Sequence, residues 1–211
     1  MIAQPAVVHV VDDDDSFRTA VARLLGAAGY EVRTYTSSGD YLLKREPGVT
    51  GCLLLDLRMP GPSGIDLQQA LAKAGEPLPI VFLSGQGDIA TSVRAIKAGA
   101  VDFLTKPVDQ DTLLEAVRDA LVRGEHERAL REQAQSWRQR YDRLTPRERE
   151  VLWQVVAGKR NKQIATSLSA SERTVKAHRA HIMRKMGATT VAELIRLAER
   201  WQTQSVPSTG C

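Results

Sequence analysis

Residues 7–13 of the chain read VVHVVDD, a short run of β-branched residues that ends at two acids. Such a run is typical of a buried strand, and the apolar residues from Phe17 to Leu25 that follow it recur at helical spacing. The stretch therefore predicts a strand that leads directly into a helix, with Asp12 and Asp13 at the carboxyl end of the strand.

This strand-and-helix pattern repeats four more times before residue 122. Five such pairs predict an α/β fold with a doubly wound, five-stranded parallel sheet. We expect the later strands at Glu31–Tyr35, Cys52–Leu55, Ile80–Leu83 and Val101–Leu104, and their helices at Tyr41–Leu43, Ile65–Leu71, Ile89–Ile96 and Leu113–Leu121.

Polar residues stand where these strands end. In a doubly wound sheet the ligand site lies beyond the carboxyl ends of the strands, which here carry Asp12, Asp13, Asp56, Ser84 and Lys106. Clustered carboxylates need a compensating cation, and oxygen ligands suit Mg²⁺. One carboxylate can then attack a phosphoryl donor while the hydroxyl and the ammonium hold the transferred oxygens. The sequence thus predicts a site that forms an aspartyl phosphate.

The motifs around these residues resemble the receiver domain of two-component response regulators. They are VVDDD at residues 10–14, LDLRMPG at 55–61 with SG at 63–64, SG at 84–85, and Phe103 before KP at 106–107. The resemblance covers residues 1–121 and implies a flavodoxin-like receiver in which Asp56 is the phosphoacceptor. It also implies the other roles: Asp12, Asp13, Asp56 and the Arg58 backbone carbonyl hold Mg²⁺ or another divalent cation, Lys106 contacts the phosphoryl group before a cis Pro107, and Ser84 and Phe103 form the switch.

Two alternatives to a phosphorylated regulator stay open at this point. A phosphohydrolase that works through an aspartyl phosphate has a similar acid cluster, but it also needs a second catalytic carboxylate and a substrate cap, whereas Leu57 and Arg58 follow Asp56. A regulator that acts without phosphorylation would not need the intact set of acids. Taken singly, each acid would more often be a strand-end residue, Ser84 a turn residue and Phe103 a core residue. Their joint placement favours the site.

The two parts of the chain carry opposite charge. Residues 1–121 hold 11 Lys and Arg against 16 Asp and Glu, net −5, whereas residues 122–211 hold 18 against 9, net +9. Such asymmetry suggests an acidic module joined to one that binds a polyanion. No apolar run reaches the roughly 18 residues of a membrane helix, and two cysteines make no disulfide framework. We therefore expect a cytoplasmic protein without a membrane partner.

A helical linker is expected over residues 122–142, where Gly124 is the one strong breaker before Thr145-Pro146. Apolar residues step along this stretch at heptad-like spacing. This seam either pairs two copies of the chain or packs the helix on its own domain. It consists of Leu130, Ala134, Trp137, Tyr141 and Leu144.

Residues 143–202 predict an all-α domain of four helices. Caps and turn residues set the helix limits, at Thr145 and Gly158, Asn161 and Leu168, Ser171 and Gly187, and Thr190. The third helix has an apolar stripe of Val175, Ile182 and Met186, with basic residues pointing elsewhere. Two helices joined by a short turn, the second of them basic, predict a helix-turn-helix.

The motifs LTPREREVL (144–152), NKQIA (161–165) and RTVKAHR (173–179) closely resemble the LuxR/NarL-type output domain. Receiver and output domain together resemble the FixJ group of response regulators, and within it the styrene-catabolism type. The resemblance implies that base edges and phosphates are contacted by the second and third helices. The expected DNA-binding residues are Lys162, Thr174, Lys176, Ala177, Arg179, Ala180 and Arg184.

The predicted function is that of a bacterial transcription factor. A sensor histidine kinase phosphorylates it on Asp56, after which it dimerises and binds promoter DNA, with RNA polymerase as a further partner. It turns over no dedicated substrate, although it loses the phosphate by self-hydrolysis. Residues 203–211 are expected to form a disordered tail.

Overall fold

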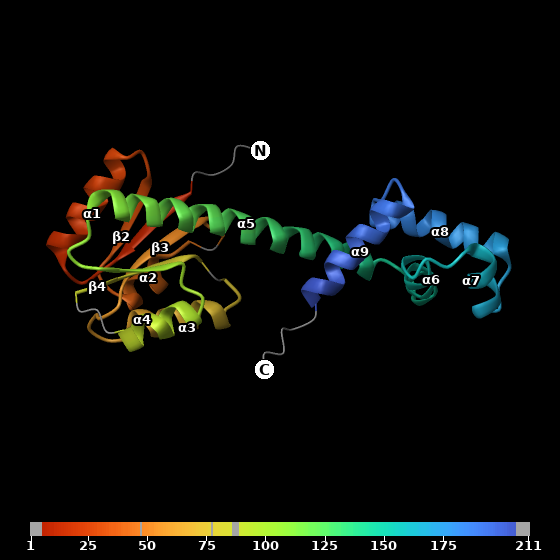
Figure 1. Cartoon of the computed structure of the whole chain (residues 1–211), viewed down its shortest axis with the longest axis horizontal. Coiled ribbons are helices and arrows are strands. Elements are labelled where there is room, and N and C mark those ends of the chain that lie inside the picture. Colours follow the sequence, from red (N-terminus) through yellow and green to blue (C-terminus); the bar gives the residue numbers. More distant parts are fainter. Residues whose placement is uncertain (1–5, 47, 77, 86–88, 206–211) are drawn as a thin grey trace. The chain divides into compact units, whose positions relative to one another are not determined.

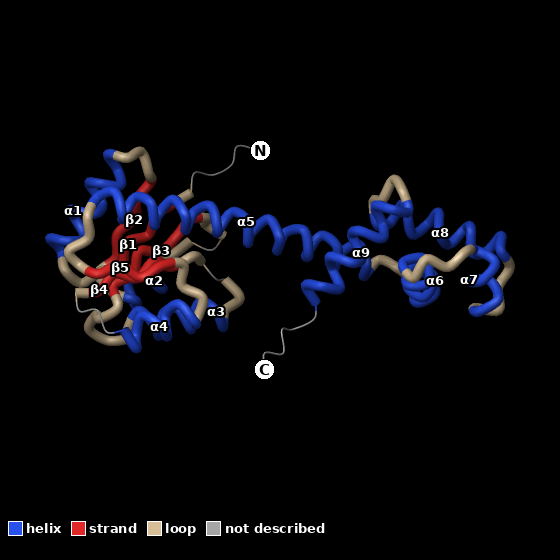
Figure 2. Tube along the Cα trace, in the orientation of Figure 1, coloured by secondary structure: helices blue, strands red, loops and turns tan. Residues whose placement is uncertain are grey.

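A computed structural model describes residues 6–46, 48–76, 78–85 and 89–205 of the chain. The chain divides into two compact units between Arg128 and Ala129 (Figure 1). The first unit mixes strands and helices, and the second is built from helices in its described part (Figure 2).

The first unit is built on a parallel sheet of five strands in the order β2-β1-β3-β4-β5. The doubly wound α/β fold predicted from the sequence is therefore confirmed. The strand order reverses between β1 and β3, which makes the ends of these two strands the expected place for a ligand. The strands are β1 (Val7–Val11), β2 (Glu31–Tyr35), β3 (Gly51–Asp56), β4 (Ile80–Ser84) and β5 (Asp102–Thr105).

Helices cover both faces of this sheet. The helices α1 (Asp15–Ala27) and the first part of α5 (Gln110–Asp142) pack on one face, and α2 (Ser38–Lys44), α3 (Gly64–Lys73) and α4 (Ile89–Lys97) pack on the other. Because successive strand residues point to opposite faces, a sheet buried on both sides needs apolar residues throughout. All five residues of β1 and of β4 are buried, and all of them except His9 and Ser84 are apolar.

Helix α5 continues through Gly124, which the sequence marks as a breaker. A Cβ atom at this position would lie 2.8 Å from Cγ of Pro79 and 3.4 Å from the Gly51 carbonyl oxygen. The glycine is therefore explained by close packing and not by a turn. Residues 110–128 of α5 belong to the first unit and residues 129–142 to the second, so the stretch expected to be a linker is shared by both.

The second unit joins the end of α5 to four further helices around one apolar core. Trp137 and Leu144 are buried in this core, and Tyr141 packs against it. These members of the apolar seam therefore pack within their own unit. The helices are α6 (Pro146–Val156), α7 (Asn161–Ser167), α8 (Glu172–Met186) and α9 (Val191–Ser205).

The expectation of a disordered tail over residues 203–211 is wrong for its first three residues. Helix α9 continues to Ser205, so residues 203–205 are helical. The rest of the expected tail, residues 206–211, lies outside the described residues.

Replacing Gly124 by alanine tests the packing of α5 on Pro79. On an open helix face Gly→Ala stabilises by up to about 1 kcal/mol. Here the new methyl group must displace Pro79, so we expect Gly124→Ala to lower the free energy of unfolding of the first unit by about 1–3 kcal/mol. Gly26→Ala in α1 is the matched control, because nothing lies within 4 Å of a Cβ atom there, and it should stabilise.

Calorimetry and tryptophan fluorescence together show which unit the Gly124→Ala substitution affects. All three tryptophans, Trp137, Trp153 and Trp201, lie in the second unit. Calorimetry should therefore detect the Gly124→Ala shift while the tryptophan fluorescence transition stays in place. A Gly124→Ala protein whose first unit is at least as stable as the wild type would contradict the packing argument.

Candidate functional site

Polar residues meet at the carboxyl edge of the sheet. Asp12 and Asp13 follow β1, Asp56 ends β3, Ser84 ends β4 and Lys106 follows β5. One carboxylate oxygen from each of Asp12, Asp13 and Asp56 lies within 4.8 Å of the other two. Hard oxygen ligands at this spacing suit a divalent cation such as Mg²⁺. The strand ends thus bring together the residues selected from the sequence.

The three carboxylates differ in exposure. Asp12 and Asp56 are buried, whereas Asp13 is exposed. Burial, opposed by the charge of Lys106 and reinforced by the negative charges of Asp12 and Asp13, raises the pKa of Asp56 above its ordinary value. Ionising Asp56 therefore costs more than ionising an exposed aspartate, and a nearby cation would offset that cost.

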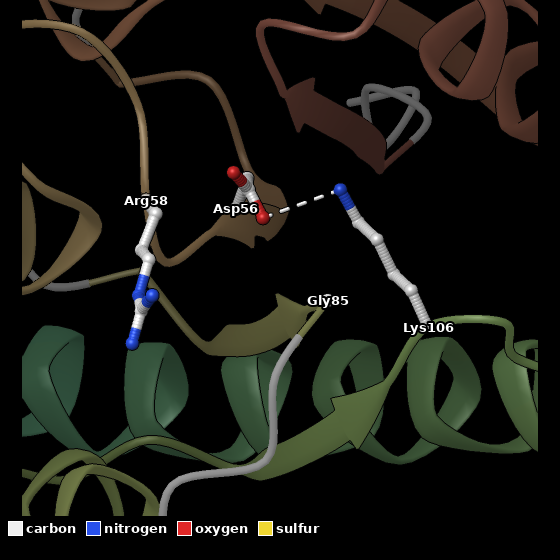
Figure 3. A pocket seen from close by; sticks show the side chains of 4 residues that line it. All are labelled: Asp56, Arg58, Gly85 and Lys106. Atoms are coloured by element: carbon white, nitrogen blue, oxygen red, sulfur yellow. Dashed lines mark ion pairs between the residues drawn. The ribbon is translucent and has the colours of Figure 1, made fainter.

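The ammonium group of Lys106 supplies positive charge to this cluster. Its Nζ atom lies 2.6 Å from Oδ2 of Asp12 and 3.2 Å from Oδ1 of Asp56 (Figure 3). Burial alone would lower the pKa of Lys106, but the hydrogen bond with Asp12 and the charges of both acids outweigh burial and raise it. The lysine therefore stays protonated and can hold a further anionic group beside the two carboxylates.

A pocket of about 310 Å³ opens at Asp56. Asp56, Arg58, Gly85 and Lys106 line it, and in Figure 3 Lys106 reaches toward Asp56 while the Arg58 side chain extends away. The Asp56 side chain therefore lies at the wall of an open pocket.

Ser84 lies on β4, the strand next to β3, and Phe103 lies on β5, one strand further from the acids. Ser84 is buried at the end of β4, and its carbonyl accepts a hydrogen bond from the Lys106 amide at 2.8 Å. The Lys106–Pro107 bond is cis. Phe103 is half-buried on β5, where it lies opposite Phe82 in the strand register, with 6.4 Å between the ring centroids.

Two contacts at this site have no counterpart in the sequence analysis. The Lys106 ammonium lies 4.2 Å from the ring centroid of Phe17, and Nη1 of Arg18 donates to the Asp12 carbonyl at 2.7 Å. From the sequence, Phe17 was predicted only to belong to the apolar face of a helix. Both residues lie in the first turn of α1, which begins directly after the acids, and that position was the available signal.

In the second unit, α7 and α8 are joined by a short turn that contains Ser169 at φ 48°. The Ser171 hydroxyl accepts from the Thr174 amide at 3.0 Å and caps α8. One face of α8 is buried through Val175, Ile182 and Met186.

The residues expected to bind DNA lie away from this buried face. Arg179 is half-buried, and the others are exposed. They are Lys162 on α7 and Thr174, Lys176, Ala177, Ala180 and Arg184 on α8.

Two family models match the chain. The response regulator receiver domain matches residues 8–118, and the LuxR family of bacterial regulatory proteins matches residues 142–198. The chain belongs to the response regulators that carry a LuxR-type DNA-binding domain. The resemblance to the FixJ group inferred from the motifs is confirmed.

Relatives match this response regulator over nearly its whole length. The response regulator protein TodT of Pseudomonas putida is 42% identical over 200 residues, which cover 95% of this chain and 88% of TodT. The transcriptional regulatory protein FixJ of Azorhizobium caulinodans is 40% identical over 90% of each chain. Among solved structures, the response regulator StyR matches with a TM-score of 0.83 and 43% identity, covering 93% of this chain and 99% of StyR.

Asp13 offers a test of cation binding that spares the fold of the regulator. Because Asp13 is exposed, we expect Asp13→Asn to leave folding intact but to weaken Mg²⁺ binding at least about tenfold, the loss that even outer partners of a metal site cause. Titration calorimetry of the full-length protein measures it. Asp15→Asn removes the same charge from an acid that pairs with Arg18, and should change the affinity much less. Equal affinities in both variants would remove Asp13 from the cation site.

Proposed function

We propose that this transcription regulator is switched by phosphorylation of Asp56 by a sensor histidine kinase. The observation that carries the proposal is the environment of the Asp56 carboxylate. It lies 3.2 Å from the Lys106 ammonium, within 4.8 Å of two other carboxylates, and at the wall of an open pocket. A nucleophile, a cation site and a fixed ammonium are the parts that phosphoryl transfer needs.

In the proposed reaction an oxygen of Asp56 attacks the phosphorus of a phosphohistidine. The new P–O bond forms as the P–N bond breaks, and the kinase histidine leaves as the imidazole. Asp12 and Asp13, with Asp56 and the Arg58 carbonyl, would hold Mg²⁺, which neutralises charge on the transferred group. Lys106 already lies against Asp56 and would contact the phosphoryl oxygens. Water later hydrolyses the acyl phosphate, and no other substrate is turned over.

Ser84 and Phe103 would couple phosphorylation of Asp56 to a structural change at the protein surface. The Ser84 hydroxyl lies at the same sheet edge and could bond a phosphoryl oxygen, while Phe103 is half-buried and could change its packing. A change of this kind at β5 would favour dimerisation because the two states differ in affinity for a second copy.

The second unit would then bind promoter DNA through α8. Exposed Lys176 can donate to a guanine edge and exposed Ala177 and Ala180 can contact a thymine methyl group, whereas Lys162 and Arg184 would neutralise phosphates.

The partners in the proposed function are the kinase, promoter DNA, a second copy of the chain and RNA polymerase. Within the described residues, none of the helices is apolar and long enough to cross a membrane, in keeping with action in the cytoplasm.

Asp56→Asn tests the phosphoacceptor. The variant keeps the size of the side chain but lacks the attacking charge, so acetyl phosphate with Mg²⁺ should add no phosphate to it. The wild type and Asp119→Asn, a matched change on the exposed face of α5, should each gain one phosphate in intact-mass spectra. Only these two proteins should shift toward dimer in sedimentation runs. Stoichiometric phosphate on Asp56→Asn would show that another residue is the nucleophile.

Lys176→Ala and Lys162→Ala separate base reading from charge. Lys176→Ala should lose about 1–3 kcal/mol on a duplex selected from a random pool and little on random DNA. Lys162→Ala should weaken both and reduce the slope of log affinity against log salt by roughly one unit. Equal losses of Lys176→Ala on selected and random duplexes at one salt concentration would make Lys176 a phosphate contact.

A further inference from the structure

We infer that Arg140 is a positioning residue for DNA binding, because it fixes the last turn of α8 from outside that helix. The inference rests on the proposed function in one respect, namely that α8 carries the DNA contacts. Arg140 lies near the end of α5, and its Nη1 atom donates to the carbonyl oxygen of Met186, the last residue of α8, at 2.9 Å.

The C-terminal end of α8 has carbonyls that the helix itself does not bond. Gly187 at φ 66° turns the chain, so that its own amide bonds the Arg184 carbonyl and the Ala188 amide bonds the Met183 carbonyl. The Met186 carbonyl, beyond these two, accepts from Arg140. A cation there also complements the negative end of the helix dipole.

Gly187 leaves the room that the guanidinium needs. A Cβ atom at residue 187 would lie 2.9 Å from Nη1 of Arg140, so a side chain at this position would push the guanidinium away. The glycine thus serves both the left-handed turn and the approach of Arg140 to the end of α8.

The turn of α5 that carries Arg140 is itself firmly held. Trp137 is buried and its ring centroid lies 6.3 Å from that of Trp201 on α9. The Tyr141 hydroxyl accepts from Nε1 of Trp153 on α6 at 3.1 Å, and the Arg149 guanidinium lies 4.8 Å from the Tyr141 ring centroid. Arg140 therefore contacts α8 from a support that is fixed on two other helices.

A second contact holds the same turn of α8 from α6. The Lys185 ammonium donates to Oε2 of buried Glu148 at 2.6 Å, and Glu148 also accepts from the Thr145 amide at 2.8 Å. Lys185 and Met186 are thus both fixed, and they follow Arg184 directly. Arg184 is exposed and is proposed to contact a phosphate, so its backbone lies in the turn that Arg140 and Glu148 immobilise.

The physical consequence concerns the entropy of binding. A last turn that frays in the free protein must be ordered when Arg184 meets its phosphate, and that ordering weakens binding. With Arg140 in place the turn is ordered beforehand. Loss of one cation at a helix C-terminus in a partly buried position corresponds to about threefold to tenfold in affinity.

The experiment is a double-mutant cycle on the full-length protein, treated with acetyl phosphate and Mg²⁺ and titrated with a duplex selected from a random pool. Arg140→Ala should bind about threefold to tenfold more weakly, and Arg140→Lys, which keeps a charged donor, should recover most of the loss. Arg138→Ala is the matched control, since Arg138 is an exposed arginine on the same helix, and should bind like the wild type.

The double-mutant cycle with Arg184→Ala shows whether Arg140 affects DNA binding through Arg184. If Arg140 acts by placing Arg184, the double variant should bind no more weakly than Arg184→Ala, and each single variant should reduce the salt slope by up to roughly one unit. Additive losses would overturn the inference, because they would make Arg140 an independent DNA contact. An Arg140→Ala protein that unfolds at lower temperature but binds DNA normally well below that temperature would also overturn it.

Lys176→Ala in the same assay separates this inference from the proposed function. If Lys176→Ala and Arg184→Ala weaken binding and Arg140→Ala does not, the role of Arg140 is wrong and the role of α8 stands. If none of the three weakens binding, α8 is not the DNA-contacting helix, and both fail. Should Arg140→Ala fold too poorly to assay, Arg140→Gln provides the neutral variant for the same cycle.

Discussion

The structure of the candidate site around Asp56 depends on one electrostatic constraint, the need to balance three carboxylates at one edge of a sheet. Asp12 and Asp56 lie at the ends of neighbouring strands, while the cation that balances them comes from beyond β5. Strands are spaced at about 4.8 Å, so β3 and β1 lie roughly 10 and 14 Å from β5. A long, flexible and charged side chain is required to cover that distance, and Lys106 meets the requirement. Adding a phosphoryl group to Asp56 increases the negative charge, so it must change this balance and whatever depends on it.

Much of the first unit could be predicted because its constraints are local. A strand buried on both faces needs a continuous apolar run, and the strand ends are therefore visible as the points where polar residues begin. Helix α5 was less predictable. Gly124 has the local character of a breaker, and its role becomes clear only through Pro79, which is distant in the sequence and close in space. The apolar seam on this helix likewise allowed two interpretations, because spacing alone does not say which surface an apolar stripe contacts.

The same distinction explains which site residues the sequence reveals. The acids, Ser84 and Lys106 follow from a topological rule about strand ends, so their convergence could be expected before any coordinates. The bonding partners of Arg18 and Arg140 could not be expected, because each arginine donates to a backbone carbonyl, at Asp12 and Met186 respectively. Every residue presents such a carbonyl, so no side-chain pattern identifies the partner. Contacts of this kind can be found only when the elements have been placed in space.

The packing of the aromatic residues restricts how two copies of the regulator can pair. Trp137 and Tyr141 contact Trp201 and Trp153 within their own unit, so a coiled coil through this seam would first have to unpack the second core. Helix α4 has no such conflict in the first unit. Its Ile89, Val93 and Ile96 recur at helical spacing with 80%, 45% and 45% of their surface exposed, and α4 packs beside β5, the strand that carries Phe103. A surface next to the proposed switch can respond to phosphorylation without disturbing either core, and for that reason we favour it over the seam.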